Sequence, residues 1–314
     1  MDVLDSLNSG LSYDLVLELT VHGENQEDLT KFALGWLTHG IDAAISVGGV
    51  GVPSEGLPVS ATGFKSASRA VKARSGKWWG HYSVAPRDSF EVLYNPLVCE
   101  VIPWVTDMVR ARPESLEAKI GEFSGSGEIG NSAIRLSLSF DEDLPSYVKL
   151  SYYISDDSLY TPDRSQREHA RLLAAANWAC RNTNVVFGHF SYVHTEGATE
   201  LERCLRGPAR VPSWNTPKWR KYLRGYSWLM VVPREISDAA GGVGTLLESG
   251  AFESISSFPN GSILLQATPT FREYEGEKVR AVQHIFREFL ITGEFRHPAP
   301  VPGQPPMHMV IFND

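Results

Sequence analysis

Alternation of apolar and polar residues marks the clearest strands of this chain. Every second residue from 134 to 140 is apolar, and a similar alternation returns from 148 to 154. A period of two places the apolar side chains of each stretch on one face of a β-sheet. Apolar and β-branched residues also dominate residues 15–20 and 185–193, so two further strands are expected there.

Capping residues predict two helices. Asn25 can accept a hydrogen bond in the first turn of one helix, which Gly40 is expected to end. Thr161 followed by Pro162 is typical of a second helix start, because threonine caps and proline fits the first helical position. This helix is expected to reach about Arg181.

Between these helices the pattern is less regular. Residues 46–63 are rich in glycine and proline, which predicts a loop, and no role for this loop follows from its residues. Residues 78–93 predict two strands around a turn at 86–88. Pro96 suits a first helical turn and apolar residues continue to about Val109, so a helix is expected there.

The last third of the chain predicts the order strand, helix, strand, strand, helix over residues 226–232, 233–248, 252–258, 263–267 and 275–290. This order resembles most of a ferredoxin-like unit. The first strand is apolar on both faces beyond Ser227, so it is expected to be central, with Trp228 buried. The earlier elements follow a loosely similar order, which admits an internal duplication.

Together these elements predict an α+β protein. At 314 residues and 42% hydrophobic composition, the chain can bury one large core or two ordinary ones. Two sheet-and-helix halves with ferredoxin-like βαββα elements are expected, over residues 1–158 and 159–314. Prolines recur from 298 to 306, which predicts an extended C-terminal strap.

Charge is distributed unevenly along the sequence. The net charge is −8, yet residues 56–87 and 203–234 contain no acidic residue. A local field of one sign steers partners of the other sign. The basic residues of the two windows are Lys65, Arg69, Lys72, Arg74, Lys77 and Arg87, then Arg203, Arg206, Arg210, Lys218, Arg220, Lys221, Arg224 and Arg234.

The second window also contains aromatic residues, and this combination predicts a partner-binding site. Arginine beside exposed tryptophan or tyrosine is typical of protein-binding hot spots and of stacking on single-stranded nucleic acid. Alternatively, the tryptophans anchor the segment to the core while the charges stay solvated. The acidic net charge favours a protein partner over nucleic acid. The predicted binding residues are Trp214, Lys218, Trp219, Arg220, Lys221 and Arg224.

No motif predicts catalysis, a cofactor or a metal. Residues 125–130 match GxGxxG, but strands are expected after them, whereas a dinucleotide site needs a helix. His189 and His194 are five residues apart on a predicted strand, so they are expected on opposite faces and cannot share a metal locally. No GxSxG or Walker-type loop occurs.

Neither the termini nor the cysteines indicate export or membrane insertion. Residues 1–5 lack a basic region before an apolar stretch, and no run of roughly 18 apolar residues occurs. Cys99, Cys180 and Cys204 are too few and too far apart to predict a disulfide scaffold. A cytoplasmic protein without a membrane segment is therefore expected; its oligomeric state does not follow from the sequence.

Residues 220–292 carry a family resemblance. Its motifs are Arg224-Gly225-Tyr226-Ser227-Trp228-Leu229, Gly241-Gly242, Leu246, Ser249-Gly250-Ala251-Phe252, Pro259-Asn260-Gly261 and Leu265-Gln266-Ala267-Thr268. This segment resembles the C-terminal portion of bacterial immunity-type proteins associated with type VI secretion and polymorphic toxin systems. The resemblance implies a protein that binds and occludes a partner, and it implies no catalytic residues.

Three hypotheses remain from the sequence. The favoured one is an immunity-type binding protein that neutralises a cognate bacterial toxin by occlusion. The second is an enzyme whose site is assembled from distant residues in a cleft. The third is a nucleic-acid-associated defence factor.

Overall fold

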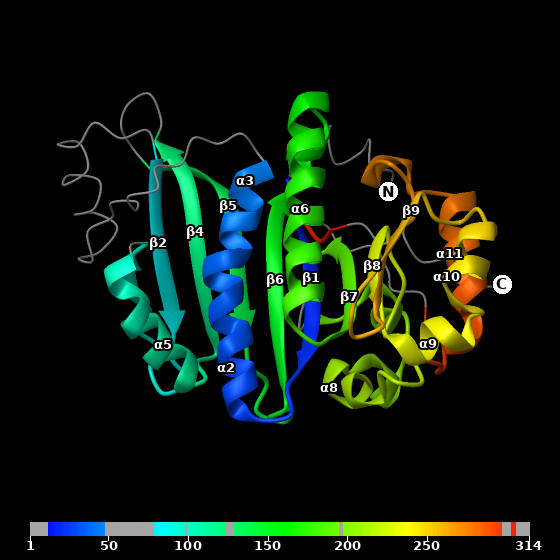
Figure 1. Cartoon of the computed structure of the whole chain (residues 1–314), viewed down its shortest axis with the longest axis horizontal. Coiled ribbons are helices and arrows are strands. Elements are labelled where there is room, and N and C mark those ends of the chain that lie inside the picture. Colours follow the sequence, from blue (N-terminus) through cyan, green and yellow to red (C-terminus); the bar gives the residue numbers. More distant parts are fainter. Residues whose placement is uncertain are drawn as a thin grey trace. The chain divides into compact units, whose positions relative to one another are not determined.

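The structure is a computed structural model, and it describes residues 12–47, 78–97, 99–123, 129–194, 197–296 and 303–305. Residues 48–63 of the predicted loop, the basic residues from Lys65 to Lys77 and most of the predicted strap lie outside the described residues. Helices combine with antiparallel strands, which confirms the α+β class (Figure 1). The chain forms two compact units, and each is described by itself below.

Unit 2 comprises residues 22–154 and 170–178. Its strands follow the order β3-β2-β4-β5-β6, and each neighbour described is antiparallel. Alternate residues of these strands, among them Leu116, Leu136 and Leu150, are buried on one face, as the period of two predicts. The strands are β2 (Trp78–Ala85), β3 (Leu93–Pro96), β4 (Ser115–Phe123), β5 (Ile129–Ser139) and β6 (Tyr147–Ser155).

Helices of unit 2 pack on this sheet. In Figure 1, α2 and α3 lie in front of β5. Trp36, between them, is fully buried and donates a hydrogen bond from Nε1 to the carbonyl oxygen of Ser137 on β5, at 3.0 Å. The helical elements are α2 (Gln26–Gly35), η1 (Trp36–Gly40), α3 (Ile41–Val47), η2 (Cys99–Val101) and α5 (Ile102–Arg110).

Two predicted helix boundaries in this unit are wrong. Gly40 does not end the first helix, because a π-helical turn, η1, carries the chain directly into α3. A Cβ at Gly40 would lie 2.9 Å from the Trp36 ring, so glycine makes room for that ring. Pro96 ends β3, and the helix begins only at Ile102.

Unit 1 comprises residues 1–21, 155–169 and 179–314. Its strands follow the antiparallel order β1-β7-β8-β10-β9. Every residue of β7, β8 and β10 is buried, so these strands are covered on both faces. The strands are β1 (Asp14–His22), β7 (Val185–Tyr192), β8 (Leu229–Val232), β9 (Ser254–Ser257) and β10 (Ile263–Gln266).

The C-terminal part of unit 1 has the predicted order of strand, helix, strand, strand and helix. The third strand, β10, lies between β8 and β9, whereas the strands of unit 2 follow a different order, so the two arrangements do not repeat one another. The helix predicted over 233–248 is divided at Gly241, which has a φ of 95°. The main helices are α6 (Pro162–Asn182), α9 (Arg234–Ala239), α10 (Gly242–Glu248) and α11 (Glu277–Phe286), with short turns η3 (Asp156–Leu159), η7 (Phe271–Glu273) and η8 (Arg287–Phe289).

Candidate partner-binding surface

The predicted binding residues lie in residues 199–224, which form several very short helices one after another. We call this stretch the basic-aromatic segment. Pro208, Pro212 and Pro217 each occupy one of the first two positions of a helix. Proline fits there but cannot continue a preceding helix, so the segment turns every few residues. Its helices are α7 (Glu200–Arg203), η5 (Gly207–Arg210), α8 (Pro212–Asn215) and η6 (Thr216–Lys218).

A buried arginine holds this segment in place. The Arg224 side chain is 2% exposed, and its guanidinium donates two hydrogen bonds to the carboxylate of Glu202, both at 3.0 Å. It also donates to Glu18 on β1 at 3.3 Å and to the carbonyl oxygen of Gly197 at 2.8 Å. Burial alone lowers the pKa of Arg224, but the carboxylates of Glu202 and Glu18 outweigh it and raise this pKa above its usual value.

The same network fixes the neighbouring backbone. Thr199 and Glu202 form a capping box: the Thr199 hydroxyl accepts from the Glu202 amide at 3.1 Å, and the Glu202 carboxylate accepts from the Thr199 amide at 2.8 Å. The Thr199 hydroxyl donates to the carbonyl oxygen of Arg224 at 2.7 Å. Asn215 of α8 donates to Glu202 at 2.9 Å. The network therefore joins α7, α8, β1 and the chain before β8.

The network corrects the prediction for Arg224, whose guanidinium belongs to the interior. Sequence reasoning missed Glu18, Glu202 and Asn215. A threonine followed three residues later by glutamate is the sequence pattern of a capping box, so Glu202 could have been found. Glu18 could not, because it is distant from Arg224 in the sequence and looks like an ordinary polar residue of an alternating strand.

The other predicted residues divide between surface and core. Trp214 is 60% exposed, and Lys218 and Lys221 are also exposed. The Arg220 side chain is 62% exposed, and its guanidinium lies 4.1 Å from the centre of the Trp219 ring. Trp219 itself is 8% exposed, so it belongs to the core. The structure thus presents one tryptophan and three cations to solvent.

Acidic residues outside the window 203–234 neutralise part of its positive charge. Some adjoin the window in sequence, and others come from distant parts of the chain. Within the part of the chain that the structure describes, ion pairs are seen for Arg206, Arg220, Arg224 and Arg234 of its eight basic residues. Among the described residues, Arg210, Lys218 and Lys221 form no ion pair. The pairs are Arg206–Glu294, Arg220–Glu235, Arg224–Glu202 with Glu18, and Arg234–Asp238.

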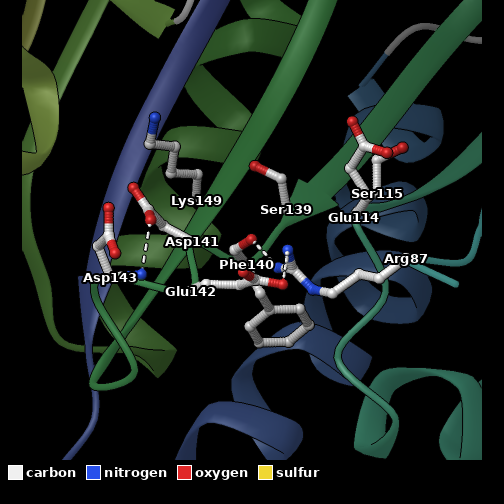
Figure 2. A pocket seen from close by; sticks show the side chains of 9 residues that line it. All are labelled: Arg87, Glu114, Ser115, Ser139, Phe140, Asp141, Glu142, Asp143 and Lys149. Atoms are coloured by element: carbon white, nitrogen blue, oxygen red, sulfur yellow. Dashed lines mark hydrogen bonds and ion pairs between the residues drawn. The ribbon is translucent and has the colours of Figure 1, made fainter.

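A polar hollow of about 500 Å³ lies in unit 2 (Figure 2). Arg87 donates to the carbonyl oxygens of Arg112, at 2.9 Å, and of Phe140, and it pairs with Glu142 at 3.0 Å. Arg87 therefore connects its own turn after β2 with the turn before β4, at Arg112, and the turn after β5, at Phe140 and Glu142. The lining residues are Arg87, Glu114, Ser115, Ser139, Phe140, Asp141, Glu142, Asp143 and Lys149, which include two serines but no histidine or cysteine.

His189 and His194, which the sequence analysis considered as metal ligands, are both buried, and each has different contacts. His189 lies on β7 and stacks on Phe187, with ring centres 5.4 Å apart. His194 lies beyond the end of β7, with Nε2 3.6 Å from a carboxylate oxygen of Glu200. Over the part of the chain that the structure describes, no three histidine, cysteine or acidic side chains are grouped to hold a metal.

Two other features bear on function. Residues 125–128 of the GxGxxG motif are not described, and its last two residues, Ile129 and Gly130, already belong to the strand β5. None of the described helices combines the length and the apolar composition needed to cross a bilayer.

Comparison with known proteins shows the fold alone. No protein-family model matches the sequence, and no curated protein matches it. Among solved structures, the chain is similar to the Pseudomonas aeruginosa T6SS protein PA0821, with a TM-score of 0.50 and 13% identity. The similarity covers 94% of this chain and 79% of that protein, so it extends well beyond residues 220–292.

Proposed function

We propose that this chain is an immunity-type protein that neutralises a cognate bacterial toxin by binding and occluding it. The observation that carries the proposal is the exposure of Trp214, at 60%, on a segment held by the buried Arg224–Glu202 pair. Trp214, Lys218, Arg220 and Lys221 form the proposed contact surface. The resemblance of residues 220–292 to immunity-type proteins and the fold similarity to a T6SS protein support this choice of function.

Exposure and anchoring together favour binding. An exposed tryptophan offers a large apolar area, and tryptophan is enriched among residues that dominate binding energy. A surface that is already ordered loses less conformational entropy on association. The protein is acidic overall, whereas Lys218 and Lys221 are exposed and without ion pairs among the described residues, so the proposed partner surface is acidic.

The first test uses the protein encoded beside this chain's gene as the partner. We expect the two proteins to form a complex and the chain to protect cells that produce the neighbouring protein. Trp214→Ala is expected to weaken binding about 30-fold, typical of a hot-spot tryptophan, with the melting temperature unchanged. Titration calorimetry and thermal melts measure the two effects. If the neighbouring protein neither binds nor is neutralised, the immunity proposal is wrong.

A second test separates this surface from general charge. Lys218→Glu with Lys221→Glu is expected to slow association several-fold at low salt and to flatten its salt dependence. The matched control is Lys31→Glu with Lys278→Glu, which changes the net charge equally at exposed lysines of α2 and α11. Equal slowing by the control would assign the effect to net charge. Binding of labelled single-stranded DNA in place of the protein would favour the nucleic-acid alternative.

A further inference from the structure

The turn between β2 and β3 of unit 2 presents apolar side chains to solvent, and we call residues 86–93 the Phe90 turn. Phe90 is fully exposed, and Val92 and Leu93 are 40% and 37% exposed. Single exposed apolar residues are ordinary, whereas a group of them is typical of a surface that binds another protein. The proposed toxin-binding surface does not include this turn.

The Phe90 turn is anchored along its length. At its start, Arg87 is held by hydrogen bonds and an ion pair to two other turns of unit 2. The Glu91 amide donates a hydrogen bond to the Ser89 hydroxyl at 3.0 Å. At its end, Leu93 begins β3 and pairs with β2. An anchored backbone loses less conformational entropy when it binds, so the exposed side chains are already ordered for a partner.

Acidic residues border the Phe90 turn. Asp88 and Glu91 belong to it, and both are exposed. Arg87, already paired with Glu142, also lines the polar hollow of unit 2, whose other charged residues are four acids and one lysine (Figure 2). Negative charge therefore exceeds positive charge around the turn. Within the described residues, the acids of this region that form no ion pair are Asp88, Glu91, Glu114 and Asp143.

The basic-aromatic segment of unit 1 has the complementary character. Val211 and Tyr222 are 40% and 39% exposed, so they add apolar surface to that of Trp214. The Trp214 amide donates to the carbonyl oxygen of Val211 at 3.1 Å. The Tyr222 amide donates to the carbonyl oxygen of Lys218, also at 3.1 Å, which places a cation beside this ring. The chain therefore carries one apolar surface with an acidic border and another with a basic border.

We propose that the Phe90 turn of one molecule binds the basic-aromatic segment of a second copy of this chain. Phe90 packs on the exposed rings of Trp214 and Tyr222, and the acids of the turn meet Lys218 and Lys221. Aromatic packing supplies apolar burial, and opposite charges fix which surfaces meet. The inference goes beyond the proposed function and does not rest on it, since it concerns this chain alone.

The contact joins unlike faces of two molecules. Each pair keeps one free Phe90 turn and one free basic-aromatic segment, so further copies add at both ends. Association occupies Trp214, and a toxin that binds there competes with it.

Sedimentation velocity of the full chain over a range of concentrations tests this contact. We expect association that grows with protein concentration and weakens as salt rises, because the charges that meet are exposed. Phe90→Ala and Trp214→Ala are each expected to weaken association about 30-fold, typical of aromatic residues that dominate an interface, with the melting temperature unchanged. The matched control is Leu247→Ala, which shortens an exposed side chain of α10 and is expected to associate as the unchanged chain does.

A mixture of the Phe90→Ala and Trp214→Ala variants gives the sharpest measurement. The first variant keeps its basic-aromatic segment and the second keeps its Phe90 turn, so one intact contact forms between them. We expect the mixture to form a 1:1 dimer that adds no further copies, at concentrations where each variant alone is monomeric.

The proposal is overturned if the unchanged chain stays monomeric at every concentration, or if the mixed variants form no dimer. Association that persists in both single variants, or that falls as much in Leu247→Ala as in Phe90→Ala, would also overturn it. Phe90→Ala is expected to leave toxin binding intact, so a failure of this proposal and a failure of the proposed function are distinguished.

Discussion

Trp228 and Trp214 show how differently one residue type is used within unit 1. Trp228 is fully buried, and its ring lies 5.4 Å from Phe190 and 4.9 Å from His169 between centres. Its Nε1 donates to the carbonyl oxygen of Thr268 at 2.8 Å. The burial expected from the apolar faces of residues 226–232 is thus confirmed. Trp214 lacks this enclosure, so its side chain is available to a partner.

Truncation of the two tryptophans separates these roles. Trp228→Ala is expected to lower the free energy of unfolding by about 3–5 kcal/mol, because it leaves a cavity among aromatic rings. Trp214→Ala is expected to change it by less than about 0.5 kcal/mol. Urea unfolding followed by circular dichroism measures both. Equal losses would mean that Trp214 also supports the fold.

Burial favours the neutral form of two histidines in the folded protein. His169 is 6% exposed; its Nε2 accepts a hydrogen bond from the Phe271 amide at 3.2 Å, and burial lowers its pKa to about 4. His81 in unit 2 is 3% exposed and stacks on Trp79. Burial, followed by the charge of Lys119, lowers the pKa of His81 to about 4 as well.

These pKa values predict a loss of stability in mild acid. Unfolded histidine titrates near its ordinary pKa of about 6.5, so between about pH 6.5 and 4 the unfolded chain binds more protons than the folded one. The free energy of unfolding is therefore expected to fall as pH drops through this window, by roughly 2–3 kcal/mol per histidine. Urea midpoints across the window measure it. His169→Gln or His81→Gln is expected to flatten the slope. An NMR titration in which the imidazole of His169 or of His81 itself titrates near pH 6.5 would contradict the prediction.

At the scale of elements, the basic-aromatic segment depends on one buried ion network. Its helices are only three or four residues long, too short to be stable alone. Arg224 stabilises the segment in their place, because it connects Glu202 of α7 with Glu18 of β1. The position of the exposed surface thus follows from a contact made in the interior.

Removal of Arg224 tests this dependence. Arg224→Met leaves two buried carboxylates without their cation, and we expect the free energy of unfolding to fall by about 3–5 kcal/mol. Arg234→Met is the control, since the Arg234–Asp238 pair is largely exposed and is expected to contribute less than about 1 kcal/mol. Denaturant unfolding of both variants decides between them. Similar losses would show that the network adds nothing beyond surface charge.

Local chemistry made several elements predictable from sequence. Asn25 caps α2 by accepting from the Asp28 amide at 2.9 Å, as its position before the apolar pattern predicts. The Thr161-Pro162 start of α6 is also confirmed, although the Thr161 side chain makes no capping hydrogen bond. The alternation over 134–140 and 148–154 correctly predicts β5 and β6.

Tertiary contacts explain what the sequence could not predict. Glycine commonly follows the end of a helix, but Gly40 packs against the ring of Trp36. The capping pattern in the sequence does not predict that contact. The acids that neutralise the window 203–234, among them Glu18 and Glu294, lie outside it in sequence. A count of charges along the chain therefore overstated the positive surface and placed Arg224 on it.

At the scale of the whole molecule, the two units are not consecutive stretches of sequence. The predicted boundary near residue 158 falls in η3, close to the change of unit at Ser155, yet residues 1–21 belong with the C-terminal stretch. Their strand β1 pairs with β7, from Leu15 opposite Tyr192 to Val21 opposite Val185. The division into halves 1–158 and 159–314 remains a prediction, and it can be tested by expression of fragments.

A fragment of residues 159–314 is expected to aggregate when produced alone. Without β1, the apolar strand β7 has an unpaired edge, which promotes association between chains. Co-production with residues 1–158 is expected to restore a soluble complex. Size-exclusion chromatography and circular dichroism measure the outcome. A monomeric, cooperatively folded 159–314 fragment would instead establish that half as an independent domain.

The course of α6 limits how proteins of this architecture can diversify. Residues 170–178 of this helix belong to unit 2, while the residues on both sides belong to unit 1. Trp178, within that stretch, packs on Trp36, with ring centres 6.2 Å apart. A genetic exchange with a single breakpoint would transfer one unit without the residues that complete it. Changes of the protein's surface are therefore expected to arise by point substitution at exposed positions, and not by shuffling of whole modules between genes.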